Sequence, residues 1–226
     1  MMTVFSGKQE NSYPHIFKQM YEQRYEIYVK RRKWSALNSL NNIEKDQYDN
    51  DNATYLLALD EEDSVLAGLR LLSTTGPHLF GDMFPQLAGT HGVPRGEHIM
   101  ELTRYYVAPL AARRQLRWWL MGVISIGMFE YCLEHGVRQI SSVIDTFLLP
   151  PMLEAGWRVR PLGLPQSYGQ GMAIGILIDV TEEAIETTRQ VRGVKGSVLR
   201  QENVDRLQRI PSHIYRPVIP ADRLFN

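Results

Sequence analysis

Two opposite charges, Glu101 and Arg104, lie inside an apolar run near the middle of this 226-residue sequence. Residues 97–107 are otherwise mostly apolar or aromatic and lie between prolines, which is typical of a β-strand. Burying a charge is costly unless it is paired, so the two side chains either reach solvent at a sheet edge or form part of a site. In a site, the carboxylate could act as a general base and the arginine could bind an anionic group. Side chains alternate across a strand, so both can serve one site only if the strand bulges between them.

Further charged residues precede this run. Arg24 lies on the apolar stripe of a helix expected over residues 14–32, and Arg70 lies in a strand expected over 65–72. A polar loop expected over 35–53 carries four closely spaced carboxylates, Glu44, Asp46, Asp49 and Asp51. Loops of this length are uncommon in compact domains and are often functional.

The acidic loop admits two interpretations. It is either a solvated segment or a site for a cationic ligand, with Tyr28 and Trp34 supplying aromatic faces. The basic run 30–33 at the end of the first helix complements the helix dipole, which is a sufficient structural reason for it.

The elements that must position these residues follow from periodicity and breakers. We expect a hairpin over 54–59 and 65–72, an irregular connection over 73–96, a helix over 111–134 and a strand over 139–143. A short helix (147–153), two strands (157–162, 172–180), a capped helix (181–191) and a surface tail complete the expected order. The 111–134 helix is apolar on nearly every face and should be packed on both sides. The order favours a mixed α+β sandwich over a doubly wound parallel sheet.

Composition narrows the class of protein. Lysine plus arginine equals aspartate plus glutamate at 25 each, which removes the general electrostatic argument for nucleic acid or an anionic membrane. The single cysteine, Cys132, excludes a disulfide framework and a cysteine-rich metal site. No signal-peptide or transmembrane pattern is present, so we expect a cytoplasmic protein. The P-loop, Gly-x-Gly-x-x-Gly, His-Glu-x-x-His and Gly-x-Ser-x-Gly motifs are also absent.

Ten positions in one register carry a resemblance: Arg24, Tyr28, Trp34, Glu44, Asp46, Asp49, Arg70, Phe84, Glu101 and Arg104. Over about residues 20–180 the chain resembles the acyl-homoserine-lactone synthases, the LuxI-type autoinducer synthases. It departs from them at Tyr28, where the family generally has phenylalanine, and at Ile144, where members that use 3-oxo-acyl groups tend to carry threonine. The run 157–165 resembles the branch that takes branched-chain or aromatic acyl groups from coenzyme A.

The resemblance implies a GCN5-related acyltransferase-like α/β/α sandwich, with a mixed, mostly antiparallel sheet splayed at a bulged central strand. It implies a synthase domain over 1–195, with 1–50 as a mobile part of the S-adenosylmethionine site, and a tail over 196–226. Mobility is expected because residues 1–50 hold few apolar anchors.

The resemblance also implies a reaction, in which the amine of S-adenosylmethionine attacks an acyl thioester and its carboxylate then closes the lactone, releasing methylthioadenosine. The implied catalytic residues are Glu101, Arg104, Arg70 and Glu44. The implied S-adenosylmethionine-binding residues are Arg24, Tyr28, Trp34, Asp46, Asp49, Phe84 and Thr103. The implied acyl-pocket residues are Met121, Val143, Ile144, Phe147, Leu148 and Met152. No metal and no cofactor are expected, because S-adenosylmethionine is a substrate.

The acyl donor is expected to be a short branched or aryl acyl-CoA, with acyl carrier protein as the alternative. Arg113, Arg114 and Arg117 could hold coenzyme A phosphates, dock an acidic carrier protein, or form a solvated helix turn. Two other functions remain open: a GCN5-related N-acyltransferase for another amine, and a catalytically dead acyl-binding sensor. Against the first, the turn at 108–112 lacks a glycine-rich pyrophosphate loop; against the second, every charged signature position is retained.

Overall fold

Strands β4 and β5 form a hairpin, as the sequence predicts. β4 spans Thr54–Asp60 and β5 spans Val65–Ser73. Asp60 closes the turn, because its side chain accepts hydrogen bonds from the backbone N–H groups of Glu62 and Ser64. The computed structural model describes residues 1–34, 39–109, 114–169, 171–199 and 209–210.

Within these residues nine strands form one sheet, in the order β1-β4-β5-β6-β7-β10-β8, with β11 beside β4 and β9 beside β10. The other strands of this sheet are β1 (Met2–Ser6), β6 (Ile99–Val107), β7 (Gln139–Asp145), β8 (Val159–Pro161), β9 (Gln166–Tyr168), β10 (Gly171–Asp179) and β11 (Arg209–Ile210). The β6–β7 and β4–β11 pairs are parallel and the rest are antiparallel. A separate two-stranded hairpin, β2 (Ser39–Leu40) with β3 (Ile43–Glu44), lies in the segment expected to be a loop.

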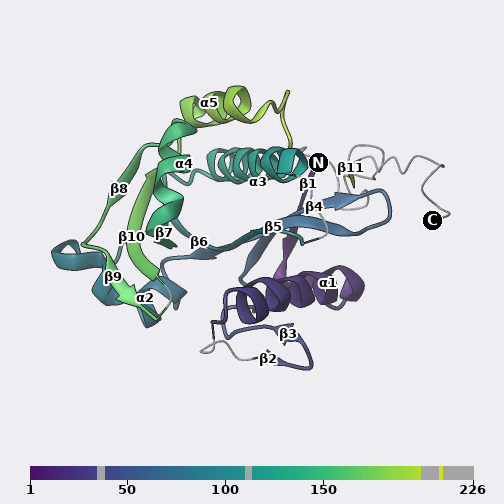
Figure 1. Cartoon of the computed structure of the whole chain (residues 1–226), viewed down its shortest axis with the longest axis horizontal. Helices are drawn as coiled ribbons and strands as arrows, with labels where there is room; N and C mark the ends of the chain where they lie inside the picture. Colours follow the sequence, from purple (N-terminus) through teal and green to yellow (C-terminus); the bar gives the residue numbers. More distant parts are fainter. Residues whose placement is uncertain (35–38, 110–113, 170, 200–208, 211–226) are drawn as a thin grey trace, which may run out of the picture.

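Helices cover both faces of the sheet, which confirms the predicted α/β/α sandwich (Figure 1). The helices are α1 (Pro14–Arg24), α2 (Leu79–Met83), α3 (Arg114–Glu134), α4 (Leu149–Glu154) and α5 (Glu182–Arg192). Shorter or irregular turns are η1 (Gly7–Gln9), η2 (Tyr25–Arg31), η3 (Pro85–His91) and η4 (Thr146–Leu148). α3 and α5 lie on one side of the sheet, and α1 lies on the other.

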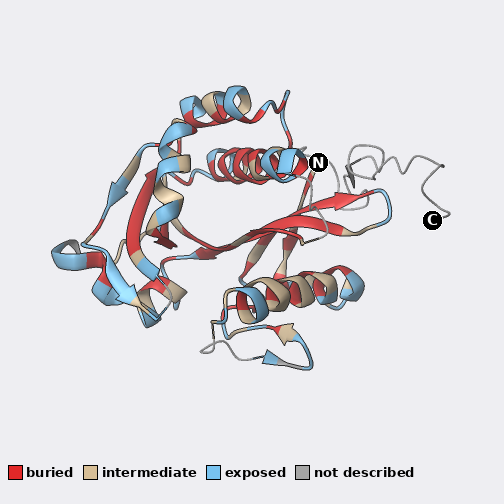
Figure 2. Ribbon diagram, viewed as in Figure 1, coloured by how far each residue is buried: buried red, intermediate tan, exposed pale blue. Residues whose placement is uncertain are grey.

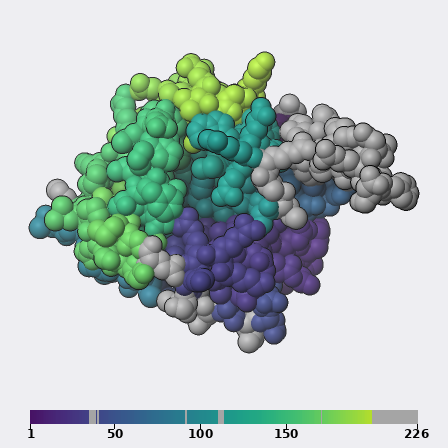
Figure 3. Space-filling model, in the orientation of Figure 1, coloured from purple at the N-terminus to yellow at the C-terminus, as the bar shows by residue number. Residues whose placement is uncertain are grey.

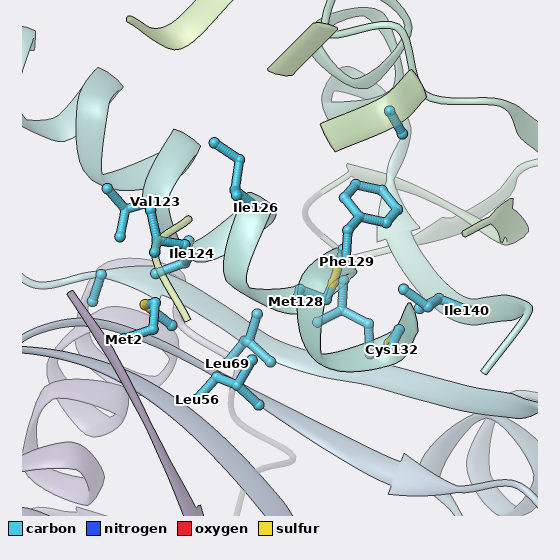
Figure 4. Packing of buried hydrophobic residues seen from close by; sticks show 14 of the residues in the cluster. Met2, Leu56, Leu69, Val123, Ile124, Ile126, Met128, Phe129, Cys132 and Ile140 are labelled. Carbon is cyan, nitrogen blue, oxygen red and sulfur yellow. The ribbon is translucent and has the colours of Figure 1, made fainter. Parts of the chain in front are cut away.

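α3 is buried on both sides, as its apolar circumference predicts. It lies between the sheet and α5, and Figure 2 shows it buried over most of its length. Figure 4 shows Met2, Leu56 and Leu69 from the strands packed against α3 residues. Gly122 permits the close approach of α5, because a Cβ there would lie 2.4 Å from the Cβ of Arg192.

The first helix differs from the single helix expected over 14–32. α1 ends at Arg24 and continues as a π-helix, η2, in which the Arg32 N–H donates to the Ile27 carbonyl at 2.9 Å. π-Helical turns are rare and occur often at functional sites. Here the wider turn lies between two expected site residues, Arg24 and Trp34.

The expectation that residues 1–50 hold few apolar anchors is wrong. β1 pairs with β4 along its whole length, and α1 buries its apolar side against the sheet. The buried anchors are Met2, Phe5, Ile16, Phe17, Met20 and Tyr21. Pattern in this segment is weak because β1 is short and three of these anchors are aromatic side chains in a mostly polar segment.

The segment expected to be a surface tail begins inside the fold. Val198 and Leu199 are buried, and their backbone N–H groups donate to Glu130 of α3 at 3.0 and 2.8 Å. Residues 200–208 and 211–226 of the expected tail lie outside the described residues. Among those residues no helix is both long and apolar enough to cross a membrane.

Candidate active site

Three arginines and three carboxylates form one buried network on the α1 side of the sheet. The arginines are Arg24 from α1, Arg70 from β5 and Arg104 from β6, and the carboxylates are Glu44, Asp46 and Asp49. Five of the six residues are buried, and the side chain of Asp46 is the most exposed, at 16%. Equal numbers of opposite charges make the burial of this network possible.

Each arginine is held by two carboxylates. Arg24 donates to both oxygens of Asp49, at 2.8 and 2.7 Å, and to Glu44 at 2.6 Å. Arg104 donates to both oxygens of Glu44, at 3.0 and 2.8 Å, and to Asp46 at 2.9 Å.

Arg70 completes the network from the neighbouring strand. It donates to both oxygens of Asp46, at 2.6 and 3.0 Å, and its Nη1 lies 2.8 Å from Asp49. Its Nε donates to the Thr103 hydroxyl at 2.9 Å. Charge-assisted, bidentate pairs of this kind fix the positions of the groups precisely.

The network stabilises the charged forms of its carboxylates. Burial alone would raise the pKa of Asp49, but the neighbouring Arg24 and Arg70 guanidiniums hold it well below its usual range. Burial opposes ionisation of Glu44 too, and Arg24 and Arg104 together lower the pKa of that carboxyl. Neither group is therefore a base at neutral pH.

A β-bulge in β6 places Arg104 in this network, as the spacing of Glu101 and Arg104 predicts. The register with β5 shifts between Gly68 and Arg70, so that one residue of β5, Leu69, lies opposite two residues of β6. Arg104 has a φ of +52°, a left-handed conformation that is uncommon for residues other than glycine. The bulge puts Thr103 and Arg104 on the same face of the sheet.

Glu101 lies on that face too, completely buried, but outside the ion pairs. Its Oε1 accepts a hydrogen bond from the backbone N–H of Phe80 at 2.8 Å, and its Oε2 has no hydrogen-bond partner among the described residues. Burial raises the pKa of Glu101 to about 7, although the Phe80 N–H, Arg70 and Arg104 act in the opposite direction. A carboxylate with a pKa near 7 and a free oxygen is suited to general-base catalysis.

The parallel strands β6 and β7 separate just beyond Glu101. They pair at Ile99 with Gln139, Met100 with Ile140, and Glu101 with Ser141, and no further pairs follow although both strands continue. This confirms the predicted splaying of the sheet at its central strand. We call the region beyond the last pair the β6–β7 split.

Two of the three expected aromatic residues, Tyr28 and Trp34, lie beside Arg104 of the network. Tyr28 is stacked on Trp34 with ring centroids 5.1 Å apart, and the Arg104 guanidinium lies 5.5 Å from the Tyr28 ring centroid. Tyr28 is buried and Trp34 partly exposed. Phe84 lies elsewhere, in a small cluster with Phe80, Leu87 and Leu162, so the structure does not place it against the other two rings.

The expected acyl-pocket residues do not all gather in one place. Four of them, Ile144, Met121, Leu148 and Met152, belong to or pack against the main core beneath α3. Val143 faces the opposite way, into the Phe80 cluster, because neighbouring residues of a strand alternate. Phe147 is 63% exposed.

Several residues of the site were not expected from sequence. Tyr55 donates to Asp49 at 2.8 Å, and Arg32 forms an ion pair with Asp145, which also accepts a hydrogen bond from Tyr168. The sequence assigns Arg32 only to the helix dipole. Asp145 lies two residues beyond the strand expected over 139–143, and this position near the end of a strand is the one available signal.

The remaining basic candidates lie at the start of α3. Arg114 and Arg117 are exposed, and Arg113 lies outside the described residues, as does most of the 108–112 turn. In the part of the chain that the structure describes, no group of three histidine, cysteine or acidic side chains could hold a metal ion.

Comparison with known proteins gives one consistent family. The family model described as "Autoinducer synthase" matches residues 8–188. The isovaleryl-homoserine lactone synthase of Bradyrhizobium diazoefficiens is 31% identical over 202 residues, covering 89% of this chain and 90% of that protein. An acyl-homoserine-lactone synthase of Aliivibrio fischeri is 32% identical over 140 residues, covering 58% of this chain and 70% of that protein.

Solved structures agree with this family. MesI, described as a CoA-dependent acyl-homoserine lactone synthase, superposes with a TM-score of 0.80 at 37% identity, covering 89% of this chain and 100% of that one. BjaI, described in the same words and solved with SAM and isopentyl-CoA, gives a TM-score of 0.80 at 31% identity, covering 92% and 95%. A putative N-acetyltransferase from Lactobacillus plantarum, with a TM-score of 0.52 at 14% identity, shares the fold alone.

Proposed function

The chain belongs to the autoinducer synthase family, and from this premise we propose that it makes an acyl-homoserine lactone from S-adenosylmethionine and an acyl thioester. The membership confirms the family resemblance and the acyltransferase class expected from the sequence. The single observation that carries the chemistry is Glu101, a buried carboxyl with a pKa of about 7 beside a paired ionic network; one of its oxygens has no hydrogen-bond partner among the described residues.

The first step is acyl transfer to nitrogen. The α-amine of S-adenosylmethionine has a reference pKa of about 8, so a base with a pKa near 7 can remove its proton as it attacks. Glu101 takes this proton directly or through water, an amide bond forms, and the thioester bond breaks to release the thiol of the donor. A positioned base of this kind contributes a factor of about 10² to 10⁴ in rate.

The second step is lactone closure. The carboxylate of the acylated product attacks the carbon next to the sulfonium, forming the ring C–O bond as the C–S bond breaks and methylthioadenosine leaves. The sulfonium takes the electron pair, so no protein nucleophile is required, and positioning of the carboxylate is sufficient. This accounts for a site without a catalytic triad.

The ionic network has a positioning role in this scheme. Asp46 is its most exposed member, and we assign it, with the Tyr28 and Trp34 faces, to the cationic substrate. Arg24, Asp49, Arg70, Glu44 and Thr103 hold Asp46 and Arg104 in place through the contacts described above. S-adenosylmethionine is then a substrate, and no separate cofactor enters the reaction.

The donor is an acyl-CoA with a short branched or aryl group. Support comes from MesI and BjaI, both described as CoA-dependent, and from the isovaleryl product in the name of the Bradyrhizobium relative. Ile144 is a bulky side chain that packs in the main core, and a bulky residue at this position favours a compact acyl group. A deep straight pocket would instead favour long acyl chains by about 0.8 kcal/mol per methylene.

The test measures methylthioadenosine release and lactone mass with acyl-CoA and acyl-carrier-protein donors of matched chains. We expect lactone and methylthioadenosine in equal amounts, with the CoA donor preferred by about tenfold or more, which corresponds to about 1.4 kcal/mol. Preference for the carrier protein would overturn the donor assignment. Thiol release with another amine but no methylthioadenosine would indicate an ordinary N-acyltransferase, and acyl binding without turnover would indicate a sensor.

The role of Glu101 is tested in the same assay with a matched pair of variants. Glu101→Gln should lose at least about a hundredfold in kcat, whereas Glu97→Gln, at an exposed position four residues earlier, should keep wild-type activity. Equal activity of the two variants would remove Glu101 from the mechanism.

A further inference from the structure

Tyr105 of β6 and Asp145 of β7 lie on opposite sides of the β6–β7 split. The last paired residues are Glu101 and Ser141; Tyr105 lies four residues further along β6, and Asp145 lies four residues further along β7. At about 3.3 Å per residue, Asp145 lies about 13 Å beyond the last pair. Tyr105 lies about 10 Å beyond it, because the bulge takes up one residue of β6. A chain of contacts from Tyr105 to Asp145 would therefore bridge β6 and β7 where the two strands are no longer paired.

Residues 28–34 make such a crossing. The Tyr28 hydroxyl donates to the carbonyl of Tyr105 at 3.1 Å, and the Tyr28 ring stacks on Trp34. The Arg32 guanidinium lies 5.5 Å from the Trp34 ring centroid and forms an ion pair with Asp145. Figure 3 shows the N-terminal part of the chain directly against residues of the C-terminal half on this side.

At the Asp145 end of this crossing, the Asp145 carboxylate has two hydrogen-bond donors. The Tyr168 hydroxyl donates to Asp145 Oδ1, while Arg32 donates to Asp145 Oδ2. Tyr168 also meets Trp34 edge-on, with centroids 6.5 Å apart, and Arg32 lies 5.6 Å from the Phe147 ring centroid. The side chain of Asp145 is 6% exposed and that of Arg32 is 33% exposed, so water screens this pair less than a surface pair.

We propose that Asp145 and Tyr168 are positioning residues for lactone synthesis: through Arg32 they hold Trp34 across the β6–β7 split, and this contact opens to admit the acyl donor and closes behind it. The proposal rests on the proposed function. Neither residue touches the reacting atoms in this scheme. Their task is to keep Trp34 against the cationic substrate and to keep water from the thioester while Glu101 acts.

Water exclusion gives a readout that general destabilisation would not change. In a closed site each thiol released from the donor is matched by one methylthioadenosine. If the contact fails, water takes the place of the amine: a hydroxyl group bonds to the acyl carbon, the C–S bond breaks, and thiol and free acid form without methylthioadenosine. The ratio of thiol to methylthioadenosine therefore reports the contact.

The main variant is Asp145→Asn, which keeps the shape of the side chain and removes its charge. We expect its thiol-to-methylthioadenosine ratio to rise about tenfold above the wild-type value of one, which corresponds to about 1.4 kcal/mol. Arg32→Met should give the same increase, and the double variant should be no worse than either single one, because both changes break one interaction. Tyr168→Phe, which removes only a hydroxyl, should give a smaller increase, and Asp145→Glu should restore a ratio near one.

Arg31→Met is the matched control, because Arg31 is the exposed neighbour of Arg32 and its loss should leave the ratio at one. A ratio of one in both Asp145→Asn and Arg32→Met would overturn the proposal. If Asp145→Asn does not fold, the ratios of Tyr168→Phe and Arg32→Met test the proposal, and a ratio of one in both would overturn it. A wild-type protein that releases no methylthioadenosine would instead overturn the proposed function, so the two failures are distinguishable.

Discussion

Glu101 and Asp49 are both buried carboxyl groups on one face of the sheet, but their surroundings move their pKa values in opposite directions. Burial dominates at Glu101 and raises its pKa to about 7. At Asp49 the adjacent Arg24 and Arg70 outweigh burial and lower it. One side chain is thus suited to accept a proton near neutral pH, and the other remains ionised. Both groups are nearly inaccessible to water, so the difference comes from the charged and hydrogen-bonding partners, which outweigh burial at Asp49 and not at Glu101.

Glu101→Gln should change how the stability of the ligand-free protein depends on pH. The folded pKa of about 7 lies above the ordinary value of 4.5, so between these values the folded state binds more protons than the unfolded state. Stability from this group therefore falls as pH rises from about 4.5 to 7, by about 3 kcal/mol in total. Urea unfolding at several pH values should show this loss in the wild type and not in Glu101→Gln. Parallel curves for the two proteins would contradict the shifted pKa, and Glu97→Gln should follow the wild type.

Asp49→Asn should destabilise the protein strongly, because Asp49 pairs with two buried arginines and accepts the Tyr55 hydroxyl. Removing one partner of a buried ion pair costs about 3–5 kcal/mol, since the other charge is left uncompensated. The control is Glu183→Gln, whose partner Arg158 is also mostly exposed; surface pairs contribute about 0–1 kcal/mol. Chemical denaturation gives both values, and similar losses in the two variants would show that the network does not behave as a buried one.

At the scale of single elements, the bulge in β6 is the feature that assembles the site. A regular strand would place Glu101 and Arg104 on opposite faces. The extra residue brings Arg104 to the side of Thr103 and Arg70, at the expense of a left-handed backbone conformation. That conformation costs about 1–2 kcal/mol for residues other than glycine, and the ion pairs of Arg104 offset it.

The strain at Arg104 predicts an unusual order of stabilities. Arg104→Ala and Arg104→Gly both lose the guanidinium, but only glycine relieves the φ of +52°. We expect the glycine variant to be more stable than the alanine variant by about 1 kcal/mol. Ser73, an exposed residue in a regular part of β5, is the control, because there alanine should be the more stable. If alanine is also the more stable residue at position 104, the bulge is not strained.

At the scale of the whole molecule, the N-terminal quarter divides into an anchored part and a part that belongs to the site. β1 and α1 are fixed by the buried side chains described above. Residues 25–34 and 39–50 carry the Tyr28–Trp34 stack and the loop carboxylates. They contact the sheet through ion pairs to Arg70 and Arg104 and through the buried rings of Tyr28 and Tyr48. The expected mobility of this quarter remains a prediction, now confined to its second part.

Hydrogen exchange with and without S-adenosylmethionine tests this division. Peptides from residues 39–50 should gain protection when the substrate binds, because ligand binding disfavours local opening of the segment that holds it. Peptides from residues 2–6 and 14–21 should exchange equally slowly in both states and serve as the internal control. Equal protection of residues 39–50 in both states would contradict closure over the substrate.

The sequence by itself determined the order of the main elements, the buried character of α3 and the candidate residues of the buried network of three arginines and three carboxylates. It could do so because hydrophobic periodicity is a local property and because charges inside apolar runs require partners. It also showed that a bulge was needed if Glu101 and Arg104 were to share a face. The sequence did not predict the short strands β1 and β9 or the β2–β3 hairpin, because segments of two to five residues are too short to show a hydrophobic period.

Only the tertiary structure decided which charges pair with which, and therefore which carboxyl group is a base. The sequence places Glu101 in an apolar run and Glu44, Asp46 and Asp49 in a polar loop, but it does not show their partners. In the structure the three loop carboxylates meet arginines from other elements, whereas Glu101 is buried and accepts a backbone N–H. The crossing from Tyr28 through Arg32 to Asp145 also depends on contacts between residues more than a hundred positions apart. Such contacts are set by how the sheet separates and how α1 packs, which no local pattern encodes.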